Sequence, residues 1–76
     1  MNSNEAVCMR ISDLCQKQKI TYYTLAYRAA IPKSTLMNLF KGTNPTISTI
    51  SKICNGLGIT MCDFFQCEYF IECEEE

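Results

Sequence analysis

The chain has 76 residues, 47% of them hydrophobic, and a net charge of −1, values that describe a single globular domain and exclude a disordered chain. No apolar run approaches the roughly 20 residues that cross a bilayer, and residues 1–10 lack the apolar centre and cleavage site of a signal peptide. We therefore expect a cytoplasmic protein with no membrane partner.

Two helices are predicted within the first 30 residues. Ser3 or Asn4 can cap the first, and apolar residues recur at helical spacing through residues 7–14 before a polar run closes it. Thr21 is a suitable cap for a second, shorter helix that ends near Ala29. The apolar face of this second helix is narrow and consists of small residues.

The third predicted helix begins at a proline and ends before a glycine. Pro32 suits the first turn of a helix, where its missing N–H would have no partner, and the helix runs to about Phe40. Its spacing buries Leu36 and Leu39. Gly42 suits the left-handed position that follows a helix.

Two further helices each begin at a threonine. Thr46 caps the fourth, and Gly56 and Gly58 mark its end. Thr60 and Asp63 have the spacing of a capping box, which opens a short fifth helix. The apolar faces of these two helices consist of Ile47, Ile50, Ile53, Cys54, Leu57, Met61, Phe64 and Phe65.

The end of the chain has a different pattern. In residues 69–73, Tyr69, Ile71 and Cys73 alternate with Phe70 and Glu72, which is strand period. These side chains are too apolar to leave in water, and an exposed strand edge pairs with other chains. We therefore separate a domain at 1–66 from an acidic tail at 67–76, expected to be a short strand that helps dimerisation. A disordered tail and a packed segment are the alternatives.

Charge is segregated along the chain. All seven basic residues lie between positions 10 and 52, where Asp13 is the only acid, so this segment carries +6. The last ten residues carry five acids and no base, a charge of −5. The overall charge of −1 argues against an anionic partner. The cationic segment, in contrast, favours one. The bases are Arg10, Lys17, Lys19, Arg28, Lys33, Lys41 and Lys52.

Six cysteines and no histidine limit the chemistry of the chain. A cytosolic protein keeps its cysteines reduced, and the spacing includes no Cys-x-x-Cys, so we interpret them as small core residues. A cysteine-only metal site and a redox switch are the alternatives. Histidine is the commonest general base, and the sequence offers no nucleophile–base pair, phosphate loop or carboxylate pair. We expect no enzymatic activity and no cofactor.

Residues 22–41 read as two short helices joined by a tight turn, the arrangement by which a helix enters the major groove of DNA. Apolar residues form the inner faces, and Ala26 is small because the two helices cross there. Lys33, Ser34 and Asn38 point outward and suit base edges, since lysine donates to guanine and asparagine pairs with adenine.

From Arg10 to Phe65, the chain resembles the helix-turn-helix family of phage repressors and Cro, also called the xenobiotic-response-element family. The residues that carry the resemblance are Leu25, Ala26, Ile31, Pro32, Leu36, Leu39, Gly42, Pro45, Ile50, Ile53, Leu57 and 63–65. The resemblance implies a five-helix all-α fold whose third helix enters the major groove. It also implies a homodimer on a two-fold DNA site and a regulator that represses by blocking promoter access.

The resemblance also assigns site residues by position. Lys33, Ser34 and Asn38 occupy base-reading positions, with Thr35 near the DNA backbone. Tyr22 stands where family members place a polar residue against a phosphate. The loop that grips the next phosphates contains Lys41, Thr43 and Asn44.

Two positions depart from the family pattern. Ala30 occupies the turn position usually filled by glycine, and an alanine in the left-handed conformation costs about 1 kcal/mol or more. Pro32 replaces the usual serine or threonine cap of the third helix. The acidic tail lies outside the family core.

Several alternatives to a repressor follow from the same sequence. One is an antitoxin-type autorepressor that also holds a protein partner. Another is a protein-interaction module on the same fold, which the absence of acids on the third helix disfavours. The third is the thiol-based redox or metal sensor.

Overall fold

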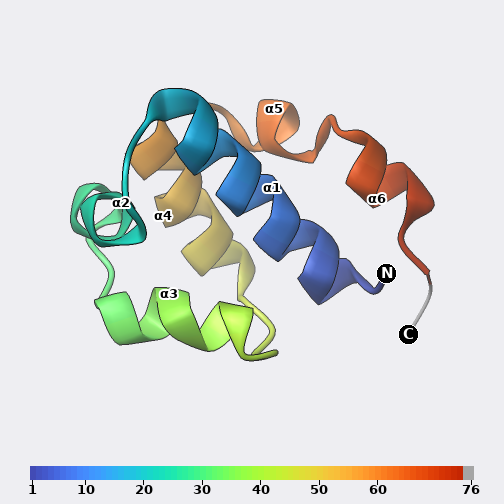
Figure 1. Cartoon of the computed structure of the whole chain (residues 1–76), viewed down its shortest axis with the longest axis horizontal. Coiled ribbons are helices and arrows are strands. Elements are labelled where there is room, and N and C mark those ends of the chain that lie inside the picture. Colours follow the sequence, from blue (N-terminus) through green and yellow to red (C-terminus); the bar gives the residue numbers. More distant parts are fainter. Residues whose placement is uncertain (75–76) are drawn as a thin grey trace.

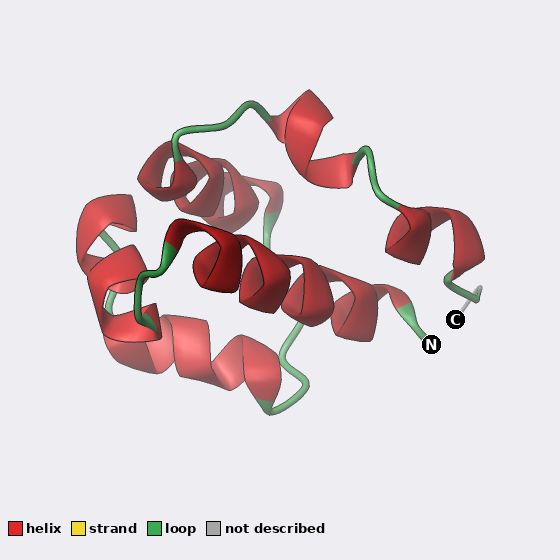
Figure 2. Ribbon diagram, turned by 45° about the horizontal axis from the view of Figure 1, so that its top comes forward, coloured by secondary structure: helices red, strands yellow, loops and turns green. Residues whose placement is uncertain are grey.

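The computed structural model describes residues 1–74, and these residues form an all-α fold, as predicted. The helices are α1 (Ser3–Gln18), α2 (Tyr22–Ala29), α3 (Lys33–Phe40), α4 (Ile47–Leu57), α5 (Met61–Phe65) and α6 (Glu68–Glu72) (Figure 1). In both views α3 lies along one edge of the molecule, away from α5 and α6 (Figures 1 and 2). Among the described helices none is both long enough and apolar enough to cross a membrane.

Threonine side chains cap three helices, which confirms the predicted starts. The hydroxyls of Thr21, Thr46 and Thr60 each accept a hydrogen bond from the backbone N–H three residues later, at 3.0–3.1 Å. Each bond satisfies one of the N–H groups that a helix leaves unpaired at its first turn. These three bonds fix where α2, α4 and α5 begin.

The predicted cap of α1 was wrong by one or two residues. The cap is Asn2, not Ser3 or Asn4, because only Asn2 forms a reciprocal pair with a glutamate three residues on. The Asn2 side chain accepts from the Glu5 N–H at 2.8 Å, and the Glu5 carboxylate accepts from the Asn2 N–H at 3.1 Å. This capping box satisfies two donors at once.

The core draws residues from α1 to α5. Phe64 of α5 is completely buried, and Phe70 of α6 packs against the edge of the cluster. The buried members are Val7, Ile11, Leu14, Cys15, Leu25, Ala26, Leu36, Leu39, Ile50, Ile53, Cys54, Leu57 and Phe64. Ile47, which the spacing placed on the apolar face of α4, is instead 68% exposed because it lies in the first turn, beyond the edge of the core.

Gly56 lies at a close approach between α2 and α4. We expected Gly56 to mark the end of α4, but it lies inside the helix and is buried, while Gly58 ends it in the left-handed conformation. A Cβ on Gly56 would lie 2.9 Å from the backbone nitrogen of Ala29 and 3.1 Å from its Cα. The missing side chain therefore lets the two helices touch.

The tail corrects a second prediction. Residues 68–72 form a helical turn, not a strand. No strand is present in residues 1–74 to pair with the tail, and a helical turn satisfies backbone groups internally through bonds such as Phe70 N–H to Cys67 O at 3.1 Å. The turn also brings the Phe70 ring to 4.8 Å from that of Phe65 and 5.9 Å from that of Phe64.

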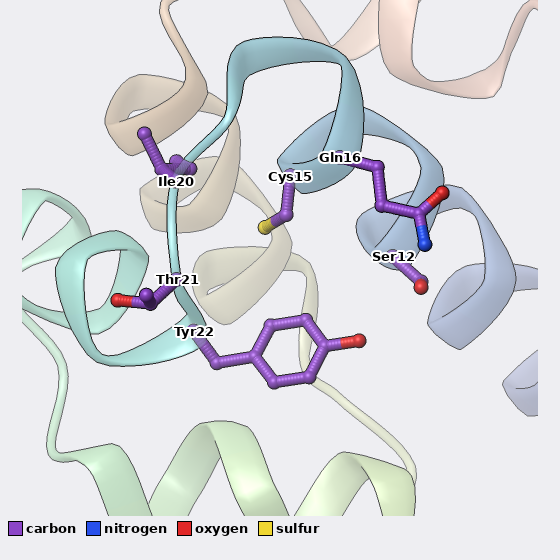
Figure 3. Close-up of a pocket in the computed structure, with 6 residues that line it drawn as sticks. All are labelled: Ser12, Cys15, Gln16, Ile20, Thr21 and Tyr22. Carbon is purple, nitrogen blue, oxygen red and sulfur yellow. The ribbon is translucent and has the colours of Figure 1, made fainter.

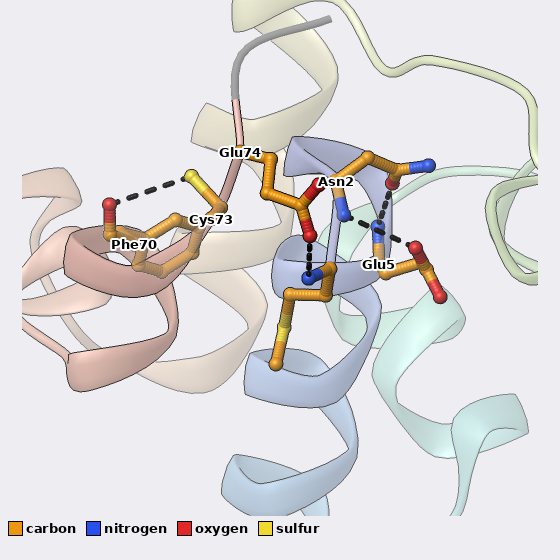
Figure 4. A network of polar contacts seen from close by, with 6 residues as sticks. Asn2, Glu5, Phe70, Cys73 and Glu74 are labelled. Atoms are coloured by element: carbon orange, nitrogen blue, oxygen red, sulfur yellow. Dashed lines mark hydrogen bonds and ion pairs between the residues drawn. The ribbon is translucent and has the colours of Figure 1, made fainter.

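The tail is bonded at two points to the amino-terminal part of the chain, once to α1 and once to Met1. The Tyr69 hydroxyl donates a short hydrogen bond to the Asp13 carboxylate. Near the amino terminus, the Met1 ammonium lies 3.1 Å from the Glu74 carboxylate, and the Glu74 N–H donates to Met1 O at 2.8 Å (Figure 4). The hydrogen bond and charge of Glu74 raise the pKa of that ammonium. The division of the chain at residue 66 stays a prediction.

Candidate nucleic-acid interface

A three-residue turn joins α2 to α3. Ala30 adopts the left-handed conformation, with φ 57° and ψ 41°, and the Ile31 N–H donates to Ala26 O at 3.1 Å. Pro32 has the extended values φ −60° and ψ 142°, so α3 starts one residue later than predicted, at Lys33. No side chain caps α3, as its proline cap implies.

The outer face of α3 is polar and free of acids. Leu36 and Leu39 are buried, which directs the other side of the helix to solvent. Lys33, Ser34 and Asn38 are exposed there, whereas Thr35 is half-buried. Between Asp13 and Asp63 the sequence contains no acid. Lysine, serine and asparagine donors on a helix of this kind can bond to base edges and phosphates.

The loop after α3 is held in a defined conformation. Gly42 has φ +107°, its N–H donates to Leu39 O at 3.1 Å, and the Thr43 N–H donates to Asn38 O at 3.0 Å. This is a Schellman motif, and it confirms the predicted role of Gly42. The Asn4 side chain donates to the Thr43 carbonyl at 3.0 Å, so α1 fixes the loop.

The predicted phosphate-binding residues of the loop are all exposed. The loop directly after α3 contains these residues, Lys41, Thr43 and Asn44, so they follow the exposed residues of that helix in the sequence. The turn and the Asn4 bond hold their backbone in place before any ligand binds. Their contact with phosphates stays a prediction.

Tyr22 is less exposed than the α3 residues. Its ring lies 4.7 Å from the ring of Phe40, which ties α2 to the end of α3. It lines a hollow of about 270 Å³ between α1 and α2, and Figure 3 shows its hydroxyl on the side of Ser12 and Gln16. The predicted phosphate contact of Tyr22 therefore has to use the hydroxyl edge of a half-buried ring.

Two tyrosines of α2 were given no functional role by the sequence-based prediction. Tyr23 is 66% exposed and Tyr27 is 82% exposed, although aromatic side chains usually contribute to the core. The Lys33 ammonium lies 5.6 Å from the centre of the Tyr23 ring. Together with Ala26 and Ile31, these three residues line a hollow of about 290 Å³. The signal was available, because both tyrosines lie opposite the buried face of α2.

Arg10 serves the fold. Its guanidinium donates to the backbone carbonyls of Asp63 and Phe64, each at 2.8 Å, and so ties α1 to the end of α5. Cations near the last carbonyls of a helix are favourable. Arg10 is therefore not among the candidate DNA contacts.

The cysteines divide between the packed interior and the surface: Cys15 and Cys54 are buried, and the Cys8 thiol donates to Leu39 O of α3 at 3.2 Å. All six are free thiols, and burial raises the pKa values of Cys15, Cys54 and Cys8, with the charge of Glu5 adding to the effect at Cys8. Within residues 1–74 no group of three cysteine, aspartate or glutamate side chains is placed to hold a metal ion.

Two short helices joined by a tight turn, the second with an exposed acid-free face, define a helix-turn-helix DNA-binding domain. A family model described as the Cro/C1-type HTH DNA-binding domain matches residues 10–69, and the chain belongs to this family. The family consists of DNA-binding domains, not enzymes.

Two solved structures share the fold. The crystal structure of the prophage Lp1 protein 11 is 35% identical, with a TM-score of 0.84 over 95% of this chain and 99% of the other. That of the wild-type restriction-modification controller protein C.Esp1396I is 21% identical, with a TM-score of 0.78 over 96% and 95%. No curated protein shows significant similarity to the chain.

Proposed function

We propose that this protein is a sequence-specific transcriptional repressor that acts in the cytoplasm and binds an inverted repeat as a homodimer. The observation that carries the proposal is the exposed, acid-free outer face of α3 within a family of DNA-binding domains. In this proposal the protein represses by occupying a promoter and blocking access to it.

The site residues have two kinds of role in this proposal, base reading and phosphate binding. Lys33 and Asn38 read base edges in the major groove, and Ser34 adds a further polar contact. Tyr22, Thr35, Lys41, Thr43 and Asn44 bind phosphates and set the position of α3. Phosphate contacts supply most of the affinity, whereas the base contacts supply about 1–3 kcal/mol of discrimination per base pair.

Dimerisation is supported by apolar side chains outside α3. Ile71 of α6 is 84% exposed, Ile47 is 68% exposed and Phe65 is 37% exposed. Apolar side chains in solvent favour contact with another chain. Because the tail is helical, its contribution comes from side chains such as Ile71 and not from strand pairing. Removing residues 67–76 and measuring mass by light scattering tests this part; an unchanged dimer contradicts it.

The experiment is selection of bound duplexes from a random DNA pool. We compare the wild type with Lys33→Ala/Asn38→Ala and with a matched control, Lys52→Ala/Asn55→Ala. The control removes the same two side-chain types from exposed positions on α4. We expect the wild type and the control to enrich one inverted repeat with half-sites about one helical turn apart.

The α3 variant should enrich no motif, or one that is relaxed at the base pairs beneath Lys33 and Asn38. If all three proteins enrich the same motif equally, base reading by α3 is wrong. If none enriches any sequence and binding is weak at low salt, the DNA-binding function is wrong. The protein-interaction alternative would then account for the fold.

A further inference from the structure

We propose that Tyr23 is a positioning residue that holds Lys33 for base recognition and thereby sets the specificity of the DNA site. The Lys33 ammonium lies 5.6 Å from the centre of the Tyr23 ring, within the range of a cation–π contact. This inference rests on the proposed function, because it assigns a cause to the orientation of a base-reading side chain.

Neighbouring tyrosines of α2 contact both ends of α3. Tyr22 stacks on Phe40, the last residue of α3, and Tyr23 lies beneath Lys33, the first. A helix of eight residues is about 12 Å long, so two neighbouring tyrosine side chains can reach its two ends. The first turn of α2 therefore contacts α3 twice. Tyr22 holds the last residue of α3, Phe40, and Tyr23 holds the side chain of the first residue, Lys33.

The place of Lys33 in the helix favours such a contact. A cation at the first position of a helix is repelled by the positive end of the helix dipole. The flanking residue, Pro32, offers no side-chain cap, and the described part of the chain gives Lys33 no acidic partner. The electron-rich face of the Tyr23 ring is the favourable site available for the ammonium. Held there, a flexible side chain loses less freedom on binding.

The same helix supplies a matched control. Tyr27 is also exposed and lines the same hollow, yet within residues 1–74 the one cation–ring contact described for Lys33 is with Tyr23. A general effect of removing an exposed tyrosine would appear in Tyr27→Leu as well as in Tyr23→Leu. An effect of positioning Lys33 would appear only in Tyr23→Leu. Tyr23→Phe would keep the DNA affinity and specificity of the wild type, because it retains the ring.

The first test measures affinity for the selected duplex and for duplexes altered at each base pair. We expect Tyr23→Leu to weaken binding about 2- to 5-fold, with the loss confined to the base pair that Lys33→Ala identifies. Tyr27→Leu and Tyr23→Phe should match the wild type. In a Lys33→Ala background, Tyr23→Leu should have no further effect. An equal effect in both backgrounds, or a loss spread over all base pairs, overturns the inference.

The second test needs no DNA. In the free protein, the side-chain protons of Lys33 should show an upfield ring-current shift in NMR spectra, which Tyr23→Leu abolishes and Tyr27→Leu preserves. Absence of the shift in the wild type overturns the inference. If no DNA is selected although the shift is present, the proposed function fails while the Tyr23–Lys33 contact stands.

Discussion

At the scale of single residues, Gly56 matters because α2 and α4 meet at it. Alanine is a better helix former than glycine by about 1 kcal/mol, so an exposed helical glycine would gain stability on replacement. At Gly56 the new Cβ would lie 2.9–3.1 Å from backbone atoms of Ala29, which cannot move aside cheaply. We expect Gly56→Ala to lower the free energy of unfolding by about 1–3 kcal/mol, measured by urea denaturation. Asn55→Ala, at an exposed neighbour, should change it little, and a stabilised Gly56→Ala would refute the close contact.

Ala30 carries backbone strain in the turn before α3. Its φ of 57° is favourable for glycine but costs an L-residue about 1–2 kcal/mol. The side chain is exposed, so no packing is lost on removing it. We expect Ala30→Gly to raise the thermal midpoint and to increase the free energy of unfolding by about 0.5–1 kcal/mol. This value allows for the greater flexibility of glycine in the unfolded chain, which offsets part of the relieved strain. Arg28→Gly, in the helical part of α2, should lower the midpoint instead.

At the scale of elements, α6 is fastened to α1 by a titratable hydrogen bond. The bond to the Asp13 carboxylate, followed by desolvation, raises the pKa of Tyr69 above its ordinary value of 10.0. A pKa raised by folding means that the bond stabilises the fold fully below pH 10, and that this contribution is lost as pH rises through the folded pKa. Ultraviolet absorbance titration should therefore show a late tyrosine component, which ionises above the ordinary tyrosine pKa of 10.0.

Tyr69→Phe should remove this late component, whereas Tyr27→Phe should leave it in place. The difference in unfolding free energy between the wild type and Tyr69→Phe should also narrow above pH 10. A late component that persists in Tyr69→Phe would contradict the assignment of the bond.

The starts of the helices were predictable where the signal is local. Threonine caps at Thr21, Thr46 and Thr60, and the left-handed Gly42, depend on atoms within four residues. The helical tail was not predictable, because alternation over five residues fits a strand as well as a helical turn until a partner is known. The ring cluster around Phe70, which decides the outcome, involves residues on another helix.

At the scale of the whole molecule, α3 and the acidic helical turn α6 are separated in the fold. The helix proposed to bind DNA lies at one edge, and α6, which carries acids, lies away from it (Figures 1 and 2). The exposed positions of Lys33, Ser34 and Asn38 followed from the spacing of Leu36 and Leu39. The contact between Tyr23 and Lys33 did not, because it depends on how α2 crosses α3.

This separation predicts strongly salt-dependent DNA binding. A protein that neutralises several phosphates loses about 10³-fold or more in affinity between about 50 and 200 mM salt. We expect Lys41→Ala to reduce the slope of log affinity against log salt by about 1 per protomer, because we propose that Lys41 binds a phosphate. Lys17→Ala, an exposed lysine of α1, should leave the slope unchanged. Equal slopes for the wild type and Lys41→Ala would exclude Lys41 from the interface.

The most direct test of the central claim, that α3 reads the major groove, is methylation of the selected duplex by dimethyl sulfate. This reagent attacks guanine N7 in the major groove and adenine N3 in the minor groove, so one experiment shows which groove the protein occupies. We predict that the bound protein protects guanine N7 in each half-site, and that Lys33→Ala restores its reactivity while adenine N3 stays reactive throughout. Protection confined to adenine N3, or unchanged by Lys33→Ala, would contradict the account.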